Sequence, residues 1–206
     1  MTVFAAPATT DRSDFRHVVR SGAKVGLITG AAVIVFLVLS RYLPEVGTMR
    51  ELVLALVVLA FAVPIAFLPG HLVGARTVEG VAGAAAVGLL GTVAFMAVDI
   101  IVLRPFKAYP WTWDAVGGNS TWWYLAIWWM LGTFTGWMGA LVGASRHARG
   151  TPTLVSLALP PLIGGLVAVV AVRVTGLAVV LPVAAGAGFL ITLTALAVVG
   201  LAQRRS

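Results

Sequence analysis

Runs of about 20 apolar residues recur along the whole chain of 206 residues, and this feature most constrains the fold. A run of that length crosses the hydrocarbon core of a bilayer when it forms an α-helix. Lipid offers the backbone no hydrogen-bond partners, so each run is expected to be a helix that satisfies its own N–H and C=O groups. We identify six spans, over residues 25–43, 52–68, 81–103, 121–144, 154–172 and 177–201.

The composition supports this interpretation, because 60% of the residues are hydrophobic and only 10% are charged. About a quarter of the residues are charged in soluble proteins. The predicted fold is therefore all-α, a polytopic transmembrane helical bundle of about six spans. One membrane domain covers residues 25–201, between a tail at residues 1–24 and a basic tail at residues 202–206. The lipid bilayer is the first expected partner.

The net charge of +7 is interpreted against the bilayer, because no Lys- or Arg-rich run resembles a nucleic-acid-binding patch. Nucleic acid is therefore not an expected partner. The chain contains no Cys, which excludes disulfides, thiolate metal sites and cysteine nucleophiles. No metalloprotease, serine-hydrolase or phosphate-binding motif occurs. We accordingly expect no catalytic constellation, no metal and no cofactor, and predict that the protein is not an enzyme.

The distribution of Lys and Arg predicts the orientation. With the N-terminus inside, nine basic residues fall on cytoplasmic segments and five on outer loops, which favours both termini in the cytoplasm. The loop at residues 104–120 then faces outward. The many Arg, Ala and Gly residues favour a bacterial source, and the start of the chain has no signal-peptide pattern. The expected location is therefore the bacterial plasma (inner) membrane.

Basic residues near the predicted cytoplasmic ends have two interpretations each. Residues 11–20 form either a helix lying on lipid headgroups or an ordinary basic flank, and we favour the flank. A second group of basic residues has two interpretations. It forms either a patch that binds lipid headgroups or a partner, or ordinary basic flanks of the spans, and we favour the flanks. Its members are His71, Arg76, Arg146, His147 and Arg149.

Asp99 is the only acid inside an apolar span, near the predicted outer end. A charge in that position normally faces the protein interior and has a partner. At 100° per residue, Gly88, Thr92 and Asp99 fall on one face of the helix. The expected partners of the carboxylate are Arg173, Arg104 and Lys107. Two interpretations are open: a cation or proton site in an outer vestibule, or a buried structural ion pair.

Tryptophan is concentrated around the outer loop. Trp111, Trp113 and Asp114 belong to the loop itself, which either caps a vestibule and stacks on a ligand or lies flat on the outer leaflet. Residues 122–124 begin the next span and are expected in the interfacial aromatic belt. Trp128 and Trp129 lie deeper, and Trp129 is expected to face protein because it shares a face with glycines.

Glycines form a stripe along the fourth span. Without side chains, such a stripe lets a neighbouring helix approach closely, which is how helices pack in lipid. Whether that neighbour belongs to the same chain or to another subunit is open. The expected packing residues are Gly132, Gly136, Gly139 and Gly143, together with Gly88 on the third span.

Two functions follow from these features. The first is a small transport component (a permease, a channel or a membrane substrate-binding subunit) with an outward vestibule. Its support is the acid inside a span, the proline-interrupted spans and a weak similarity between residues 70–75 and 139–144. The alternative is a non-catalytic structural or accessory subunit of a larger membrane complex. Its support is the small number of polar groups through the middle of the spans. The protein partners considered are other membrane subunits or further copies of the chain in a homo-oligomer.

Overall fold

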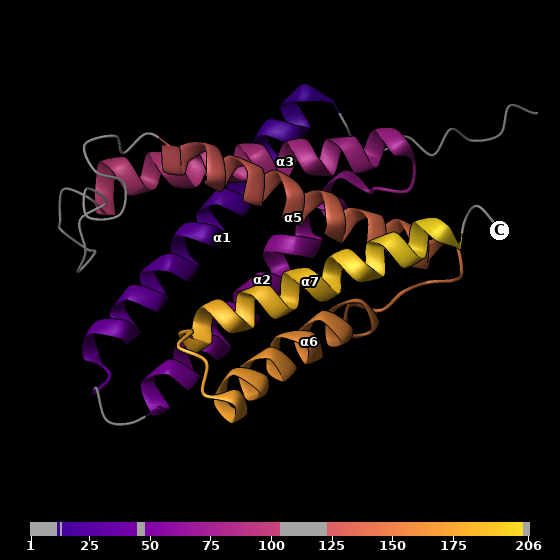
Figure 1. Cartoon of the computed structure of the whole chain (residues 1–206). Helices are drawn as coiled ribbons and strands as arrows, with labels where there is room; N and C mark the ends of the chain where they lie inside the picture. The colour runs from indigo at the N-terminus through magenta and orange to yellow at the C-terminus, as the bar shows by residue number, and fades with distance from the viewer. Residues whose placement is uncertain (1–11, 13, 45–47, 104–122, 204–206) are drawn as a thin grey trace, which may run out of the picture.

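The computed structural model describes residue 12 and residues 14–44, 48–103 and 123–203, which form a bundle of helices (Figure 1). No strand occurs in this described part of the chain, so the predicted all-helical fold is confirmed. A short π-helix, η1 (Asp99–Leu103), continues α3. The long helices are α1 (Phe15–Tyr42), α2 (Met49–Val73), α3 (Val78–Val98), α5 (Trp123–His147), α6 (Leu154–Thr175) and α7 (Leu181–Ala202).

Within the described residues, five helices are long and apolar enough to cross a membrane: α1, α2, α3 with η1, α6 and α7. Their outward faces carry large apolar side chains such as Ile191, which is 70% exposed, and Val167, which is 60% exposed. Water would disfavour so much exposed apolar surface, whereas lipid does not. The chain is therefore a multi-pass integral membrane protein.

The sixth predicted span, α5, does not belong to that set of five among the described residues. The helix nevertheless lies inside the bundle, where it packs against α2, α3 and α7 (Figure 1). A sixth crossing by α5 stays a prediction.

The helices pack in a definite order across the bundle. α3 lies between α1 and α5, while α5 and α2 both contact α7. α6 packs chiefly on α7 at the lower edge of Figure 1 and has few contacts with α2 and α5. The core is built from small residues and a few large ones, including Ala66, Phe189 and Leu193, which are almost fully buried.

The first helix begins and the last helix ends at the same end of the bundle, here called the terminal end. His17 Nε2 on α1 donates a hydrogen bond to the carbonyl oxygen of Leu72 at the end of α2 (2.8 Å). The ends of α2 and α5 line one hollow together. Arg149, after α5, donates a hydrogen bond to Gln203 Oε1, after α7. The loop between α6 and α7 lies at the opposite end.

α1 begins ten residues before the predicted start of the first span, at Phe15 instead of Val25. The Asp14 side chain caps it by accepting a hydrogen bond from His17 N (3.0 Å). Val18 and Ser21 are buried against the rest of the bundle. Residues 15–24 are therefore the first turns of α1.

α2 passes through Pro64 and Pro69 and ends only at Val73, beyond the predicted end at Leu68. A proline removes one backbone donor but leaves the remaining helical hydrogen bonds in place. A helix that stopped inside lipid would expose unpaired backbone groups, which costs more than the prolines do. The helix ends where Gly74 adopts a left-handed conformation with φ of 66°.

Candidate ligand cavity

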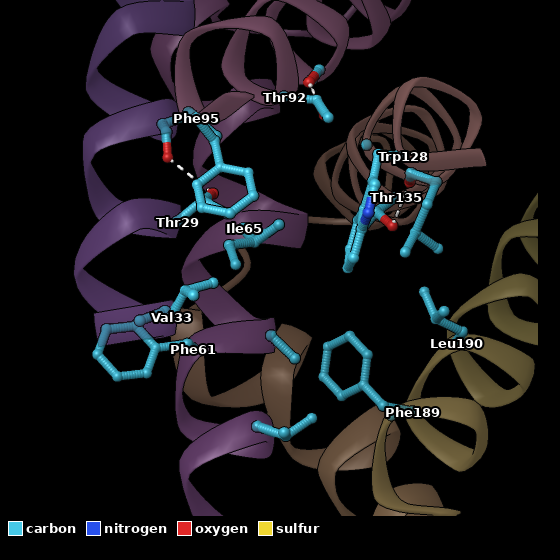
Figure 2. Close-up of a pocket in the computed structure, with 18 of the residues that line it drawn as sticks. Thr29, Val33, Phe61, Ile65, Thr92, Phe95, Trp128, Thr135, Phe189 and Leu190 are labelled. Carbon is cyan, nitrogen blue, oxygen red and sulfur yellow. Dashed lines mark hydrogen bonds between the residues drawn. The ribbon is translucent and has the colours of Figure 1, made fainter. Parts of the chain in front are cut away.

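A cavity of about 290 Å³ lies in the middle of the bundle, between α1, α2, α3, α5 and α7 (Figure 2). This volume lies at the small end of the range for organic ligands. Among the long helices that the structure describes, α6 alone contributes no lining residue. The labelled residues in Figure 2 are Thr29, Val33, Phe61, Ile65, Thr92, Phe95, Trp128, Thr135, Phe189 and Leu190.

The glycine face of α1 explains why a space opens here. A Cβ at Gly22 would lie 2.6 Å from Leu90 Cβ, and one at Gly26 would lie 2.6 Å from Ala94 Cβ, so α1 and α3 almost touch. One turn further, a Cβ at Gly30 would lie 3.7 Å from its nearest neighbour. The two helices thus separate toward the middle of the bundle, and the cavity begins beside this point.

The polar side-chain groups in the described wall are threonine hydroxyls, which bond to their own helices, and the indole N–H of Trp128. Thr29 Oγ1 donates to the carbonyl oxygen four residues earlier (2.9 Å), as do Thr92 Oγ1 (3.0 Å) and Thr135 Oγ1 (2.7 Å). The threonine donors are therefore used, and none of the lining residues that the structure describes is charged. Such a cavity excludes water and favours an apolar occupant.

Aromatic rings supply much of the remaining wall. Trp128 and Phe95 form an edge-to-face pair with ring centroids 6.5 Å apart and an interplanar angle of 67°. Phe61 and Phe189 approach from the other side of the space, on α2 and α7 (Figure 2). The faces of such rings carry partial negative charge, so they attract organic cations as well as apolar groups.

Asp99 lies one helical turn beyond the cavity. It follows Phe95 by four residues, about 6 Å of helix rise, on the face that carries Thr92. It is 4% exposed and takes part in a polar interaction. The π-helical turn η1 starts at this residue, and such turns are frequent at functional positions.

The structure does not bring Asp99 and Arg173 together. Figure 1 shows the end of α3 and the end of α6 on opposite sides of the bundle. Arg173 instead lines a hollow with Glu51, whose carboxylate accepts a hydrogen bond from Leu181 N (3.4 Å). The other members of the predicted vestibule, Arg104, Lys107, Trp111, Trp113 and Asp114, lie outside the described residues, as do the side chains of the predicted aromatic belt.

Three of the four glycines in the α5 stripe contact neighbouring helices of the same chain. A Cβ at Gly132 would overlap Thr92 Oγ1 of α3, and one at Gly139 would overlap the Ala66 carbonyl oxygen of α2. A Cβ at Gly136 would lie 2.9 Å from the carbonyl oxygen of Ala84.

Gly88 and Gly143 complete the set of predicted packing residues. On α3, a Cβ at Gly88 would overlap the carbonyl oxygen of Gly132, so the two helices touch through their backbones. A Cβ at Gly143 would have nothing within 4 Å, so within the described part of the chain no helix packs against it. The stripe is therefore used inside the chain at its first three positions and faces open space at the fourth.

Trp128 is the main cavity residue that the sequence analysis did not single out. The sequence contains a signal for its position, since Trp128, Gly132 and Thr135 follow the i, i+4, i+7 spacing of one helix face. Trp129, the next residue, points elsewhere: its Nε1 donates to Met96 Sδ (3.0 Å), although the side chain is 40% exposed. Comparisons of the chain with protein-family models, curated proteins and solved structures give no match.

Proposed function

We propose that this membrane protein is a small transport component that binds a hydrophobic organic cation. The apolar part of the ligand occupies the central cavity, and its positive charge lies toward Asp99. The observation that carries the proposal is an aromatic, uncharged cavity followed, one turn along the same helix face, by a buried acid.

The physical basis is charge compensation in a medium of low dielectric constant. Asp99 already takes part in a polar interaction, and a cation bound near a buried carboxylate lowers further the cost of holding that charge away from water. The ligand gains from transferring its apolar surface into a dry cavity. Cation–π attraction to Trp128 and Phe95 adds about 0.5–2 kcal/mol when the site is desolvated.

An inorganic ion fits the cavity less well. Metal and alkali cations need several oxygen ligands to replace their hydration shell. The side-chain oxygens of the described lining are the hydroxyls of Thr29, Thr92 and Thr135, which are too few to replace a hydration shell. The ligand class favoured by this wall is therefore an organic cation with aromatic or branched apolar groups.

For the orientation, we propose that the terminal end lies in the cytoplasm of a bacterial cell. Among the described residues, seven Lys and Arg side chains belong to the terminal half and three to the opposite end. This bias agrees with the rule that cytoplasmic segments are enriched in Lys and Arg. The cavity then lies within the membrane, and Asp99 lies toward the outer face.

A structural or accessory subunit of a membrane complex is the second candidate. The observation in its favour is that none of the described residues lining the cavity is charged. Against it, Gly132, Gly136 and Gly139 are occupied by helices of the same chain and cannot dock a partner. Purification from native membranes with fixed stoichiometric partners would favour this candidate.

The test is the binding of tetraphenylphosphonium, a hydrophobic cation, to the purified protein, and its exchange across proteoliposomes compared with protein-free liposomes. We expect Asp99→Asn to weaken binding about tenfold or more, because a charge-assisted interaction is worth roughly 1.5–3 kcal/mol. Gly186→Leu should also weaken binding, since Gly186 lines the cavity and has room for a Cβ.

Val183→Leu is the matched control, because it adds volume on the same helix at a position that is 59% exposed to lipid. It should bind the probe like the unchanged protein. If tetraphenylphosphonium binds none of these proteins, or binds the Asp99→Asn and Gly186→Leu variants with unchanged affinity, the proposed function is wrong.

A further inference from the structure

A second hollow, of about 620 Å³, lies at the terminal end, away from the central cavity. It is bounded by the last turns of α2, the last turns of α5 and the first turn of α6. This groove is defined by its lining residues. They are Val63, Pro64, Phe67, Leu68, Gly70, His71, Gly74, Ala75, Arg76, Gly139, Ala140, Gly143, His147, Pro152, Leu154 and Leu157.

The groove has a basic mouth and an apolar floor. His71, Arg76 and His147 lie where α2 and α5 end, and no acid is among the described residues that line the groove. Val63 and Phe67 continue the groove along α2 toward the middle of the bundle. From Val63 to Gly74 the helix rises about 16 Å, so the floor is long enough for much of an acyl chain.

The packing of α5 and α6 leaves this space open. Gly139 of α5 touches the backbone of α2 at Ala66, but one turn later Gly143 faces a volume in which a Cβ would meet nothing within 4 Å. α6 would be the helix to fill it, yet it begins only at Leu154 and packs chiefly on α7. The hollow is thus a result of the helix arrangement.

We propose that this groove binds an anionic phospholipid, with the phosphate at the basic mouth and one acyl chain along the apolar floor. Arg76 supplies charged N–H donors for the phosphate oxygens, and His71 supplies an imidazole N–H. His147 is held on the groove wall by the hydrogen bond from its Nδ1 to the Gly143 carbonyl oxygen (2.9 Å).

The position of the groove favours a lipid over a soluble anion. The mouth coincides with helix ends, where phosphate headgroups lie in a bilayer, and the floor continues into the apolar part of the bundle. The terminal half also carries most of the described basic residues, and such surfaces attract anionic lipids. This site is separate from the central cavity and does not depend on the function proposed for it.

The experiment is native mass spectrometry of delipidated protein titrated with dioleoylphosphatidylglycerol or with dioleoylphosphatidylcholine. We expect one tightly bound phosphatidylglycerol, with affinity about tenfold higher than that for phosphatidylcholine. Arg76→Gln should remove this preference. Gly143→Leu should prevent binding of both lipids at this site, because its side chain would fill the groove in space that is open in the structure.

Arg173→Gln is the matched control, since it removes an exposed arginine at the opposite end of the bundle, and it should keep the preference. His147→Gln is a further variant at the mouth, where the side chain is exposed, and should weaken phosphatidylglycerol binding.

Equal affinity for the two lipids, or an unchanged preference in Arg76→Gln and His147→Gln, would overturn the proposal. Glycerol phosphate that competes as strongly as phosphatidylglycerol would show a site for the free headgroup only, which also overturns it.

Discussion

At the scale of single residues, Gly139 and Gly143 provide the sharpest test of the structure. They lie one turn apart on the same face of α5, but a Cβ at Gly139 overlaps the Ala66 carbonyl oxygen and one at Gly143 meets open space. We expect Gly139→Ala to lower the free energy of unfolding by about 1–3 kcal/mol through overpacking. Gly143→Ala should leave it unchanged or raise it by up to about 1 kcal/mol.

Denaturation of both variants in the same detergent measures this difference. Equal destabilisation by the two changes would contradict the packing of α5 on α2. The sequence predicted that this stripe packs, because its spacing places the glycines on one face. The sequence did not distinguish Gly143 from the other three glycines. Whether a glycine touches a neighbour depends on how far α6 and the end of α2 lie from α5. The spacing of residues along α5 carries no information on those distances.

The candidate site was predictable only in part, and for a similar reason. Asp99 stood out because a carboxylate in an apolar span is rare, and it is buried in the structure. Arg173 was an expected partner because both residues lie at the same predicted membrane face. The structure places α6 and α3 on opposite sides of the bundle. The sequence predicts how deep a residue lies in the membrane, but it does not predict where its helix lies around the bundle.

At the scale of helices, the pairing of α6 with α7 is the most isolated contact in the fold. A Cβ at Gly188 would lie 2.5 Å from Ala168 Cβ and 2.6 Å from the Gly164 carbonyl oxygen. We expect Gly188→Val to push α6 away from α7 and to leave α1, α2, α3 and α5 together, because α6 has few other neighbours. Trypsin should then cut after Arg149 and Arg173, which flank α6, roughly tenfold faster.

Gly186→Ala on the same helix is the control for this proteolysis experiment. A Cβ there makes an ordinary contact, 3.5 Å from Val58 Cγ1, so the cleavage rate should not change. If trypsin cuts Gly188→Val and Gly186→Ala at the same rate, α6 and α7 do not pack as closely at Gly188 as the structure shows.

Helix existence was largely predictable, whereas helix ends were not. Hydropathy located every long helix of the described residues, because lipid demands apolar helices of a minimum length. It missed the first ten residues of α1, which are polar on one side and buried on the other. It also missed the passage of α2 through its prolines and the π-helical turn at Asp99. These three features depend on neighbouring helices. Such neighbours form hydrogen bonds with, or cover, backbone and side-chain polar groups that one span alone leaves without a partner.

At the scale of the whole molecule, the arrangement predicts which loops share a side of the membrane. The chain has no Cys, so single-cysteine variants report one position each. Val78, which starts α3, and Thr151, between α5 and α6, lie at the terminal end, whereas Ala178, between α6 and α7, lies at the opposite end. With the proposed orientation, a membrane-impermeant maleimide should label Ala178→Cys in intact cells.

Val78→Cys and Thr151→Cys should then react only after the membrane is permeabilised. Their shared side is the informative result, because α3 and α5 both lie between them along the chain. If α3 crosses the membrane and α5 does not, the two cysteines react from different sides, and the bundle has five crossings. The reverse labelling of all three positions would instead keep six crossings and place the terminal end outside, which would also place the basic groove on the outer leaflet.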